Sequence, residues 1–343
     1  MKKIFILICV IILTGKISFS QINTGYRIAN KFQVEGEGGW DFINIDESTG
    51  RLFISHSTVV NVIDSQNGKL IGTIPDTKGV HGIAIANDLN KGFISNGRDS
   101  SVTVFDLQTL KFITKVNVTG INPDAILYDP YSRKIFVFNA KSNNATVIDG
   151  KSNEVTGTIQ FPGNPEVGVT DGKGNVFVNI EDISMICKIN PMTLNIEQSW
   201  SVAPGEEPSG LAIDAENHRL FSVCSNKLMV VVNSDDGSIV TTLPIGERVD
   251  GAAFDSVLKR AYSSNGEGSL TVVQEEDANT FNVLENVDTQ KGARTLTLDN
   301  TTHHIYLPTA EFGAPPEPTA DNPHPRPAIL PNTFVVLDIE PVK

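Results

Sequence analysis

The feature that most constrains this chain is a repeat of about 42 residues that recurs seven times. Each copy opens with a short apolar segment that ends in a polar residue, as in Asp41–Asp46. The seven copies begin at Asp41, His81, Asp124, Glu166, Ser209, Asp250 and Arg294. Regular repetition of this length is typical of architectures in which each unit buries its apolar face against the next unit.

Every copy contains further strand signals. A second segment opens on an aromatic residue, as at Phe53 and Phe93, a third ends in a polar step such as Asp64, and a fourth follows after a turn. These segments are rich in Val, Ile, Thr and Phe, and Gly, Asn and Asp separate them. No stretch shows a sustained helical period. The pattern predicts an all-β fold, a seven-bladed β-propeller with four antiparallel strands in each blade.

The two ends of the repeat region complement each other. The seventh copy supplies three strands, up to Asp338, and the missing fourth-strand pattern occurs at Tyr26–Val34. We therefore expect the N-terminal strand to complete blade seven and close the ring. The sequence therefore predicts one propeller domain over residues 21–343, with residues 310–332 as an insertion in blade seven.

The first twenty residues have the features of a bacterial signal peptide. Lys2 and Lys3 precede an apolar run, Ile4–Leu13, which is too short to span a bilayer, and small residues precede Gln21. We expect residues 1–20 to be removed and the mature protein to be secreted or periplasmic. No later segment is apolar and long enough to cross a membrane. The mature chain would keep 24 basic against 40 acidic residues, a net charge of −16.

Cys187 and Cys224 are the cysteines of the expected mature chain. An oxidising compartment permits a disulfide between them. Free cysteines in proteins are usually buried, and this favours two buried thiols over a disulfide.

The second strands carry a motif that ends in a polar residue. It reads Phe-Ile-Ser-Asn at 93–96, Phe-Val-Phe-Asn at 136–139 and Tyr-Ser-Ser-Asn at 262–265, with His56 ending the first copy. This resembles the Tyr-Val-Thr-Asn motif of the YVTN-repeat, YncE-like seven-bladed propellers, over residues 22–343. The resemblance implies the same fold, and it suggests nucleic-acid binding. The terminal polar residues themselves are expected to cap strand ends and turns.

The first residues of the seven copies are the candidate site. In a propeller the innermost strands line the central channel, and the loops that enter them share one face, the channel mouth. We expect a ring there, called the mouth ring below, made of Asp41, His81, Asp124, Glu166, Ser209, Asp250 and Arg294. A solvated rim of paired charges is one interpretation. The other is a ligand site, because converging carboxylates suit cationic ligands and hard cations.

The mouth ring also predicts which residues would hold a metal. His81 has Asp41 and Asp124 as neighbours in the ring, and these three are the candidate ligands of a divalent cation such as Ca²⁺ or Mg²⁺. No other cofactor is indicated. Trp40, next to Asp41, offers a stacking surface for a ligand or packs within its own loop.

A proline-rich segment interrupts blade seven. Ala310–Asn332, called the arm below, contains seven prolines and is expected to be extended and to leave the propeller on the mouth face. Phe312, His324 and Arg326 could then close over a ligand as a lid. The alternative is a surface elaboration that only packs on blade seven.

These features favour a monomeric binding propeller without catalysis, which takes a small ligand or a partner protein at the channel mouth. A metal-assisted lactonase or lyase, using His81 with Asp124 or Glu166, is the first alternative. Nucleic-acid binding is the second, and the charge of −16 opposes it because phosphates are bound by clustered Lys and Arg. No zinc-protease, esterase or P-loop motif occurs in the sequence.

Overall fold

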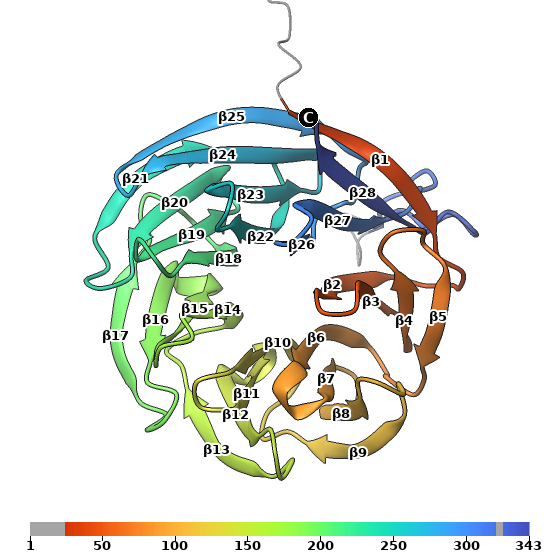
Figure 1. Cartoon of the computed structure of the whole chain (residues 1–343), viewed down its shortest axis with the longest axis horizontal. Coiled ribbons are helices and arrows are strands. Elements are labelled where there is room, and N and C mark those ends of the chain that lie inside the picture. Colours follow the sequence, from red (N-terminus) through yellow and green to blue (C-terminus); the bar gives the residue numbers. More distant parts are fainter. Residues whose placement is uncertain (1–24, 320–324, 343) are drawn as a thin grey trace, which may run out of the picture.

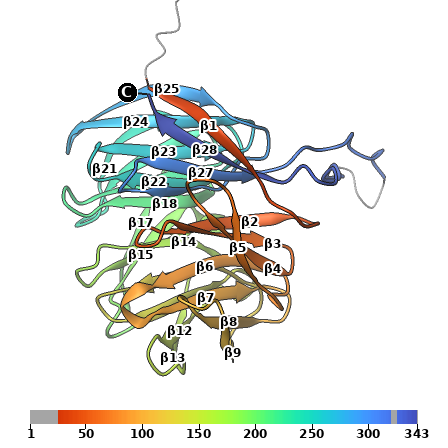
Figure 2. The ribbon, with the colours of Figure 1, turned by 45° about the vertical axis from the view of Figure 1, so that its right-hand side comes forward.

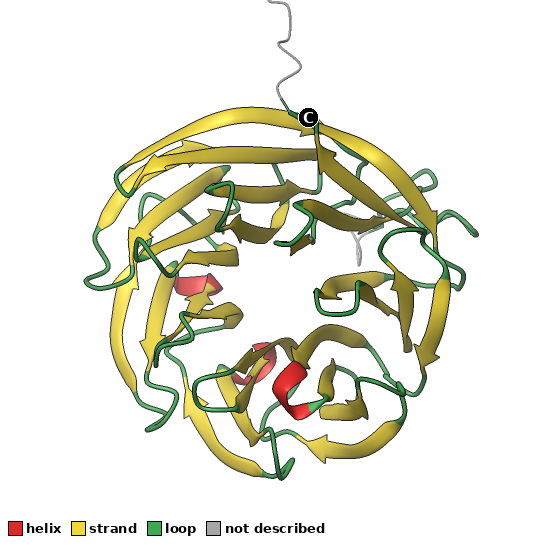
Figure 3. Cartoon of the chain, in the orientation of Figure 1, coloured by secondary structure: helices red, strands yellow, loops and turns green. Residues whose placement is uncertain are grey.

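The computed structural model describes residues 25–319 and 325–342, and it is a ring of seven four-stranded antiparallel sheets (Figure 1). Nearly all regular structure in the described residues is strand, with three short 3₁₀ turns (Figure 3). These turns are η1 (Asn87–Leu89), η2 (Ala140–Ser142) and η3 (Glu181–Ile183). The predicted seven-bladed propeller is confirmed. The expected signal peptide lies outside the described residues.

Each blade runs in chain order from its innermost to its outermost strand, except that blade seven ends on β1. Blade one contains β2 (Trp40–Asp46), β3 (Arg51–His56), β4 (Val59–Asp64) and β5 (Leu70–Ile74). Blade two contains β6 (Val80–Ala86), β7 (Lys91–Asn96), β8 (Ser101–Asp106) and β9 (Phe112–Asn117). Blade three contains β10 (Pro123–Asp129), β11 (Lys134–Asn139), β12 (Asn144–Asp149) and β13 (Val155–Gln160). Blade four contains β14 (Pro165–Thr170), β15 (Val176–Ile180), β16 (Met185–Ile189) and β17 (Ile196–Ser201).

The remaining blades follow the same order. Blade five contains β18 (Pro208–Asp214), β19 (Arg219–Cys224), β20 (Leu228–Asn233) and β21 (Ile239–Pro244). Blade six contains β22 (Val249–Asp255), β23 (Arg260–Asn265), β24 (Ser269–Asp277) and β25 (Thr280–Asp288). Blade seven contains β26 (Thr297–Asp299), β27 (His304–Thr309), β28 (Val335–Pro341) and β1 (Tyr26–Gln33).

Blade seven is built from both ends of the described chain, as predicted. β1 pairs antiparallel with β28 from Tyr26 opposite Pro341 to Gln33 opposite Val335. Tyr26 also contacts blade six, because its hydroxyl lies 2.8 Å from the hydroxyl of Tyr262 and accepts a hydrogen bond from Arg260. The first strand of this blade, β26, begins at Thr297 and so is shorter than the predicted segment from Arg294.

The core lies between successive blades. The aromatic residues that open the second strands are buried, and their rings pack against neighbouring blades. Phe53 lies 5.7 Å from Phe105 of blade two, and Phe221 is stacked 5.1 Å from Phe254 of blade six. Burial of one such ring contributes roughly 2–3 kcal/mol to stability. The repeat therefore maintains the ring by placing one large apolar residue at each junction.

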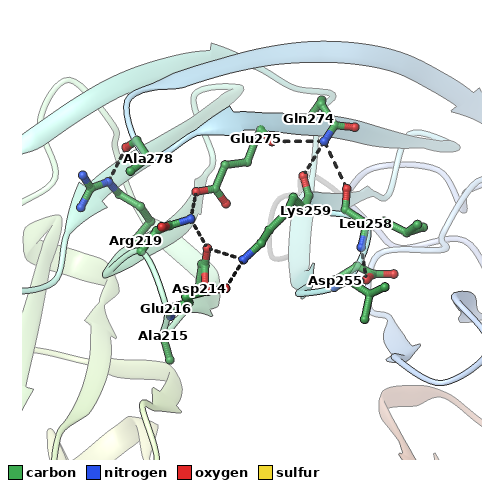
Figure 4. A network of polar contacts seen from close by, with 12 residues as sticks. Asp214, Ala215, Glu216, Arg219, Asp255, Leu258, Lys259, Gln274, Glu275 and Ala278 are labelled. Atoms are coloured by element: carbon green, nitrogen blue, oxygen red, sulfur yellow. Dashed lines mark hydrogen bonds and ion pairs between the residues drawn. The ribbon is translucent and has the colours of Figure 1, made fainter.

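Polar groups join the blades on the face opposite the mouth. Figure 4 shows Asp214, Lys259 and Glu275 at the junction of blades five and six. Asn217 donates to both Asp214 and Glu275, at 2.9 and 2.8 Å. Asp214 and Glu275 are only 2% and 4% exposed. The Lys259 ammonium lies 3.5 Å from Asp214 and 2.6 Å from Glu216. Burial, followed by the charge of Asp214, raises the pKa of Glu275 to about 7.

Cys187 and Cys224 are buried and form no disulfide, in agreement with the prediction of two buried thiols. Burial raises the pKa of both thiols.

Within residues 25–319 and 325–342, no helix has the length and apolar character that a membrane span requires.

Candidate functional site

The mouth ring brings His81 between two carboxylates from neighbouring blades. Its Nδ1 lies 2.6 Å from Oδ2 of Asp41 and 3.4 Å from Oδ1 of Asp124. One donor atom from each of the three residues lies within 4.8 Å of the other two. The beginnings of strands β2, β6 and β10 thus bring the predicted metal ligands together. Their spacing allows one cation to contact all three.

The orientation of His81 is fixed on both edges of its ring. Its Nδ1 edge faces the carboxylates, and its other edge lies against Gly97, where an added Cβ would be 2.7 Å from Nε2. Burial by itself would lower the pKa of His81. The hydrogen bond to Asp41 and the charges of Asp124 and Asp41 outweigh this, so that the pKa is raised.

A pair of carboxyl groups continues the cluster into blade four. Asn164 donates through Nδ2 to Glu166 at 3.1 Å and to Glu181 at 2.9 Å, and so holds the two together. Burial, followed by the charges of Asp124 and Glu181, raises the pKa of Glu166 to about 8. Burial, opposed by His81, raises the pKa of Asp124 to about 6. We call Asp41, Asp124, Glu166 and Glu181 the acidic arc.

The opposite side of the mouth ring is neutralised by Arg294. Its guanidinium donates to Oδ1 of Asp41 at 3.0 Å and forms an ion pair with Asp250. Asp41 therefore joins the Arg294 side of the ring to the His81 side. Ser209 differs from the prediction, because it is only 8% exposed and its hydroxyl donates to the carbonyl of Val249. Ser209 contributes to the contact between blades rather than to the group around His81.

A cavity of about 110 Å³ lies next to the acidic arc. Its walls are residues 42–44, 82–83, 125–126 and 167–168, and each of these segments starts one residue after a member of the mouth ring. Phe42 extends from blade one to the buried cluster that contains Ala125 of blade three. The side chain of Phe42 thus reaches across the channel just inside the mouth.

The aromatic residues near the arm pack against one another. Trp40 is stacked on Phe334 with ring centroids 5.2 Å apart, and Phe312 lies 5.9 Å from Trp40. The base of the arm is closed by a bridge between Phe312 and Ile329. This geometry favours the interpretation of Trp40 as a packed loop residue.

The described parts of the arm run away from the blades rather than back over them (Figure 2). Arg326 is exposed on this segment. His324, the third residue of the predicted lid, lies outside the described residues. Closure of a lid over a ligand stays a prediction.

The polar residues that end the second strands stabilise turns. Asn96, Asn139 and Asn265 are fully buried, and each donates across the turn to two side chains of the following strand. His56 lies 3.1 Å from Asn61 and its ring packs on Phe334. These residues have the capping role that the sequence predicted.

Sequence reasoning missed three residues of the site. Glu181 starts η3 in the turn between the second and third strands, which also reaches the mouth face, so aligning these turns across the repeats would have found it. Asn164 precedes Glu166 by two residues. Phe42 was identifiable as the aromatic residue at a repeat position that elsewhere holds Gly, Ala, Val or Thr.

No protein-family model matches this chain. Among curated proteins it is similar to the uncharacterized protein YncE of Salmonella typhimurium, with 22% identity over 213 residues. The match covers 62% of this chain and 48% of YncE, so the two correspond over about half the length of that relative. Together with the seven blades, the match agrees with the YncE-like resemblance seen in the repeat motifs.

Solved propeller structures superimpose on most of the chain. The WD40 repeats of RRP9 give a TM-score of 0.75 at 8% identity and cover 92% of this chain and 98% of that chain. Hydrazine synthase of Kuenenia stuttgartiensis gives 0.64 at 16% identity and covers 80% of this chain and 94% of that chain. At such identities the likeness shows the fold alone.

Proposed function

We propose that this protein is a secreted or periplasmic binding propeller that holds a small cation, or a ligand with a cationic group, at its channel mouth. The observation that carries the proposal is the position of His81 between Asp41 and Asp124, with donor atoms of all three within 4.8 Å of one another. Three groups of this kind, drawn from three blades, make a preformed site for positive charge.

The distribution of charge around the mouth ring supports a cation. The four carboxyl groups of the acidic arc come from blades one, three and four. On the other side of the ring, Arg294 forms ion pairs with Asp41 and Asp250. The raised pKa values of Asp124 and Glu166 mean that these buried carboxyl groups retain protons to higher pH than ordinary carboxyls. A bound cation would replace those protons and satisfy the same oxygens.

The neighbours of His81 support a binding role. Its Nδ1 faces two carboxylates, which together attract positive charge. The same contact with Asp41 also orients an imidazole for proton transfer, and the side chain is 28% exposed. A metal-assisted lactonase or lyase is therefore the second candidate, favoured by the same three possible metal ligands.

Two features of the sequence support the location and the class of ligand. The lysines and the short apolar run of residues 1–13 are those of an export signal. An expected mature charge of −16 favours a cationic ligand over nucleic acid.

Titration calorimetry at pH 8 with chlorides of calcium, magnesium, zinc and ammonium tests the proposal. We expect saturable binding of at least one cation, and its loss in the double variant His81→Ala, Asp124→Asn with an unchanged melting temperature. Glu206→Gln is the matched control, because Glu206 is an exposed carboxylate on the loop that enters blade five. Equal affinity in the double variant would remove the site, and metal-dependent hydrolysis of a lactone would favour the second candidate.

A further inference from the structure

We infer that the mouth takes a primary ammonium ion with a short apolar body, in which the ammonium contacts the acidic arc and the apolar body enters the adjacent cavity. This inference rests on the proposed function and names the class of ligand. It comes from two observations together, the apolar walls of the cavity and the unfilled hydrogen-bonding capacity beside Glu166.

The side chains that line the cavity are apolar except for that of Asn44. Phe42, Ile126 and Val167 come from blades one, three and four and line the same space of about 110 Å³. The polar side chain in the wall, Asn44, already donates to the carbonyl of Ile83 at 2.9 Å. A hydrated ion gains nothing from such walls, whereas an alkyl group gains by leaving water.

The groups next to the cavity need donors of hydrogen bonds. Asp124 immediately precedes Ala125 in the wall, and Glu166 immediately precedes Val167. Asn164 uses Nδ2 on Glu166 and Glu181, and its buried Oδ1 has no hydrogen-bond partner among the described residues. An ammonium group offers three N–H donors and one positive charge to these acceptors.

A divalent metal ion fits this part of the mouth less well. Ca²⁺ takes six to eight oxygen ligands. Apart from Asn44, the side chains that line the adjacent cavity are alkyl groups and an aromatic ring, which offer no oxygen ligands. An ammonium ion also leaves His81 free to keep its proton and its hydrogen bond to Asp41, whereas a metal bound at Nδ1 would displace both.

Phe42 sets the length of the body that the cavity accepts. Its side chain lines the cavity and packs from blade one against the cluster around Ala125, so it bounds the space that a ligand can occupy. A ligand with a few carbon atoms would fill the space, and a longer chain would collide with the ring. Replacing Phe42 by Ala should extend the cavity along the channel without changing any charge.

The experiment is calorimetry with a series of straight-chain alkylammonium chlorides, from ammonium to hexylammonium, beside the matching neutral alcohols and calcium, magnesium and zinc chlorides. We expect affinity to rise about fourfold with each methylene up to propyl or butyl and then to fall. The alcohols should bind at least tenfold more weakly. Glu166→Gln should weaken the amines at least tenfold, Phe42→Ala should move the optimum to longer chains, and Glu206→Gln should change neither.

The outcomes separate this inference from the proposed function. Binding of a metal ion with no binding of amines, or amine binding without dependence on chain length, would overturn the inference and leave a cation site in place. Absence of binding by every cation would overturn both. Phe42→Ala alters only the cavity, and Glu166→Gln alters only the charge. The test remains decisive if only one of these two variants folds.

Discussion

Nδ1 of His81 lies 2.6 Å from Oδ2 of Asp41, although the two residues are 40 positions apart in the sequence. The contact joins the same position of two successive repeats, since each residue is the second residue of the innermost strand of its blade. The hydrogen bond to Asp41 and the charges of Asp124 and Asp41 outweigh burial and raise the pKa of His81. Proton release is therefore part of any metal binding at that nitrogen.

Cation affinity at the mouth should rise with pH. The pKa values of Asp124 and Glu166 are raised to about 6 and about 8, so these groups lose their protons, and gain the charge that binds a cation, as the pH rises through those values. We expect the affinity for calcium or butylammonium to increase on the order of tenfold or more between pH 6 and pH 8.5. Glu166→Gln should flatten the upper part of the profile, and an affinity independent of pH would contradict the role of these carboxyls.

Gly97→Ala should displace His81 from its carboxylates, because the added Cβ would lie 2.7 Å from Nε2. We expect the pKa of His81 to return toward its ordinary value near 6.5, as measured by NMR titration, and metal affinity to fall severalfold. Gly39→Ala is the control, since a Cβ there meets no atom within 4 Å. A His81 titration curve identical to that of the wild type would show that Gly97 does not fix the ring.

The junction of blades five and six should weaken as the pH rises. The pKa of Glu275 is raised from 4.5 to about 7, so the folded state holds a proton that the unfolded chain loses, and stability falls between those two pH values. Glu275→Gln should raise the free energy of unfolding at pH 8 by up to about 3 kcal/mol and leave it unchanged at pH 4.

The matched control for this junction is Glu216→Gln. Glu216 contacts the same Lys259 but its side chain is 77% exposed, so the change should stay within about 0.5 kcal/mol at either pH. Denaturant unfolding at the two pH values measures both variants. A Glu275→Gln protein that is less stable at pH 8 would show that the ionised carboxylate is favourable there.

Removal of residues 21–34 should open blade seven. The variant would lack β1 and expose the edge of β28, so we expect a lower melting temperature and association in size-exclusion chromatography. Tyr26→Phe should cost about 1 kcal/mol through the lost hydrogen bonds to Tyr262 and Arg260, whereas Arg27→Ala removes only an exposed ion pair. A truncated protein that melts like the full chain would contradict the closure.

The arm should be dispensable beyond its base. Replacement of residues 313–328 by a short Gly-Ser turn keeps Phe312 and Ile329, and we expect the melting temperature to stay unchanged. Phe312→Ala should lower stability by about 1–3 kcal/mol because it removes the ring that packs on Trp40. Calorimetric melts of both variants test this prediction. If the arm replacement lowered the melting temperature as much as Phe312→Ala, residues 313–328 would contribute to the stability of the fold.

The sequence predicted the blades well because each blade repeats the same local pattern. The polar residue at the second position of β2, Asp41, and the aromatic residue in β3, Phe53, have counterparts at similar spacing around the ring. Blade seven deviates from this pattern where the residues before its first strand contact blade one. Thr295 donates its hydroxyl to the carbonyl of Asp41 in blade one, and the strand ladder begins only after it, at Thr297.

The candidate site was less predictable. Repeat position places His81 and Asp124 at the mouth, but it does not give the direction of a side chain, and Ser209 at the same position bonds to Val249. The reach of Phe42 across the channel depends on the ring diameter and on the small residue Ala125 opposite, neither of which is local in sequence. The raised pKa of Glu166 depends on burial and on Glu181, which belongs to a different element.

The pairing of β1 with β28 also governs the order of events during synthesis. Arg27 and Glu340, which face each other in that pair, are separated by 313 residues. A ribosome delivers β1 long before its partner strand exists, so the early chain can collect blades but cannot close the circle. Closure is thus a late step with a large loop entropy cost. Until it happens, the blades form an open arc that exposes an unpaired strand edge of β28.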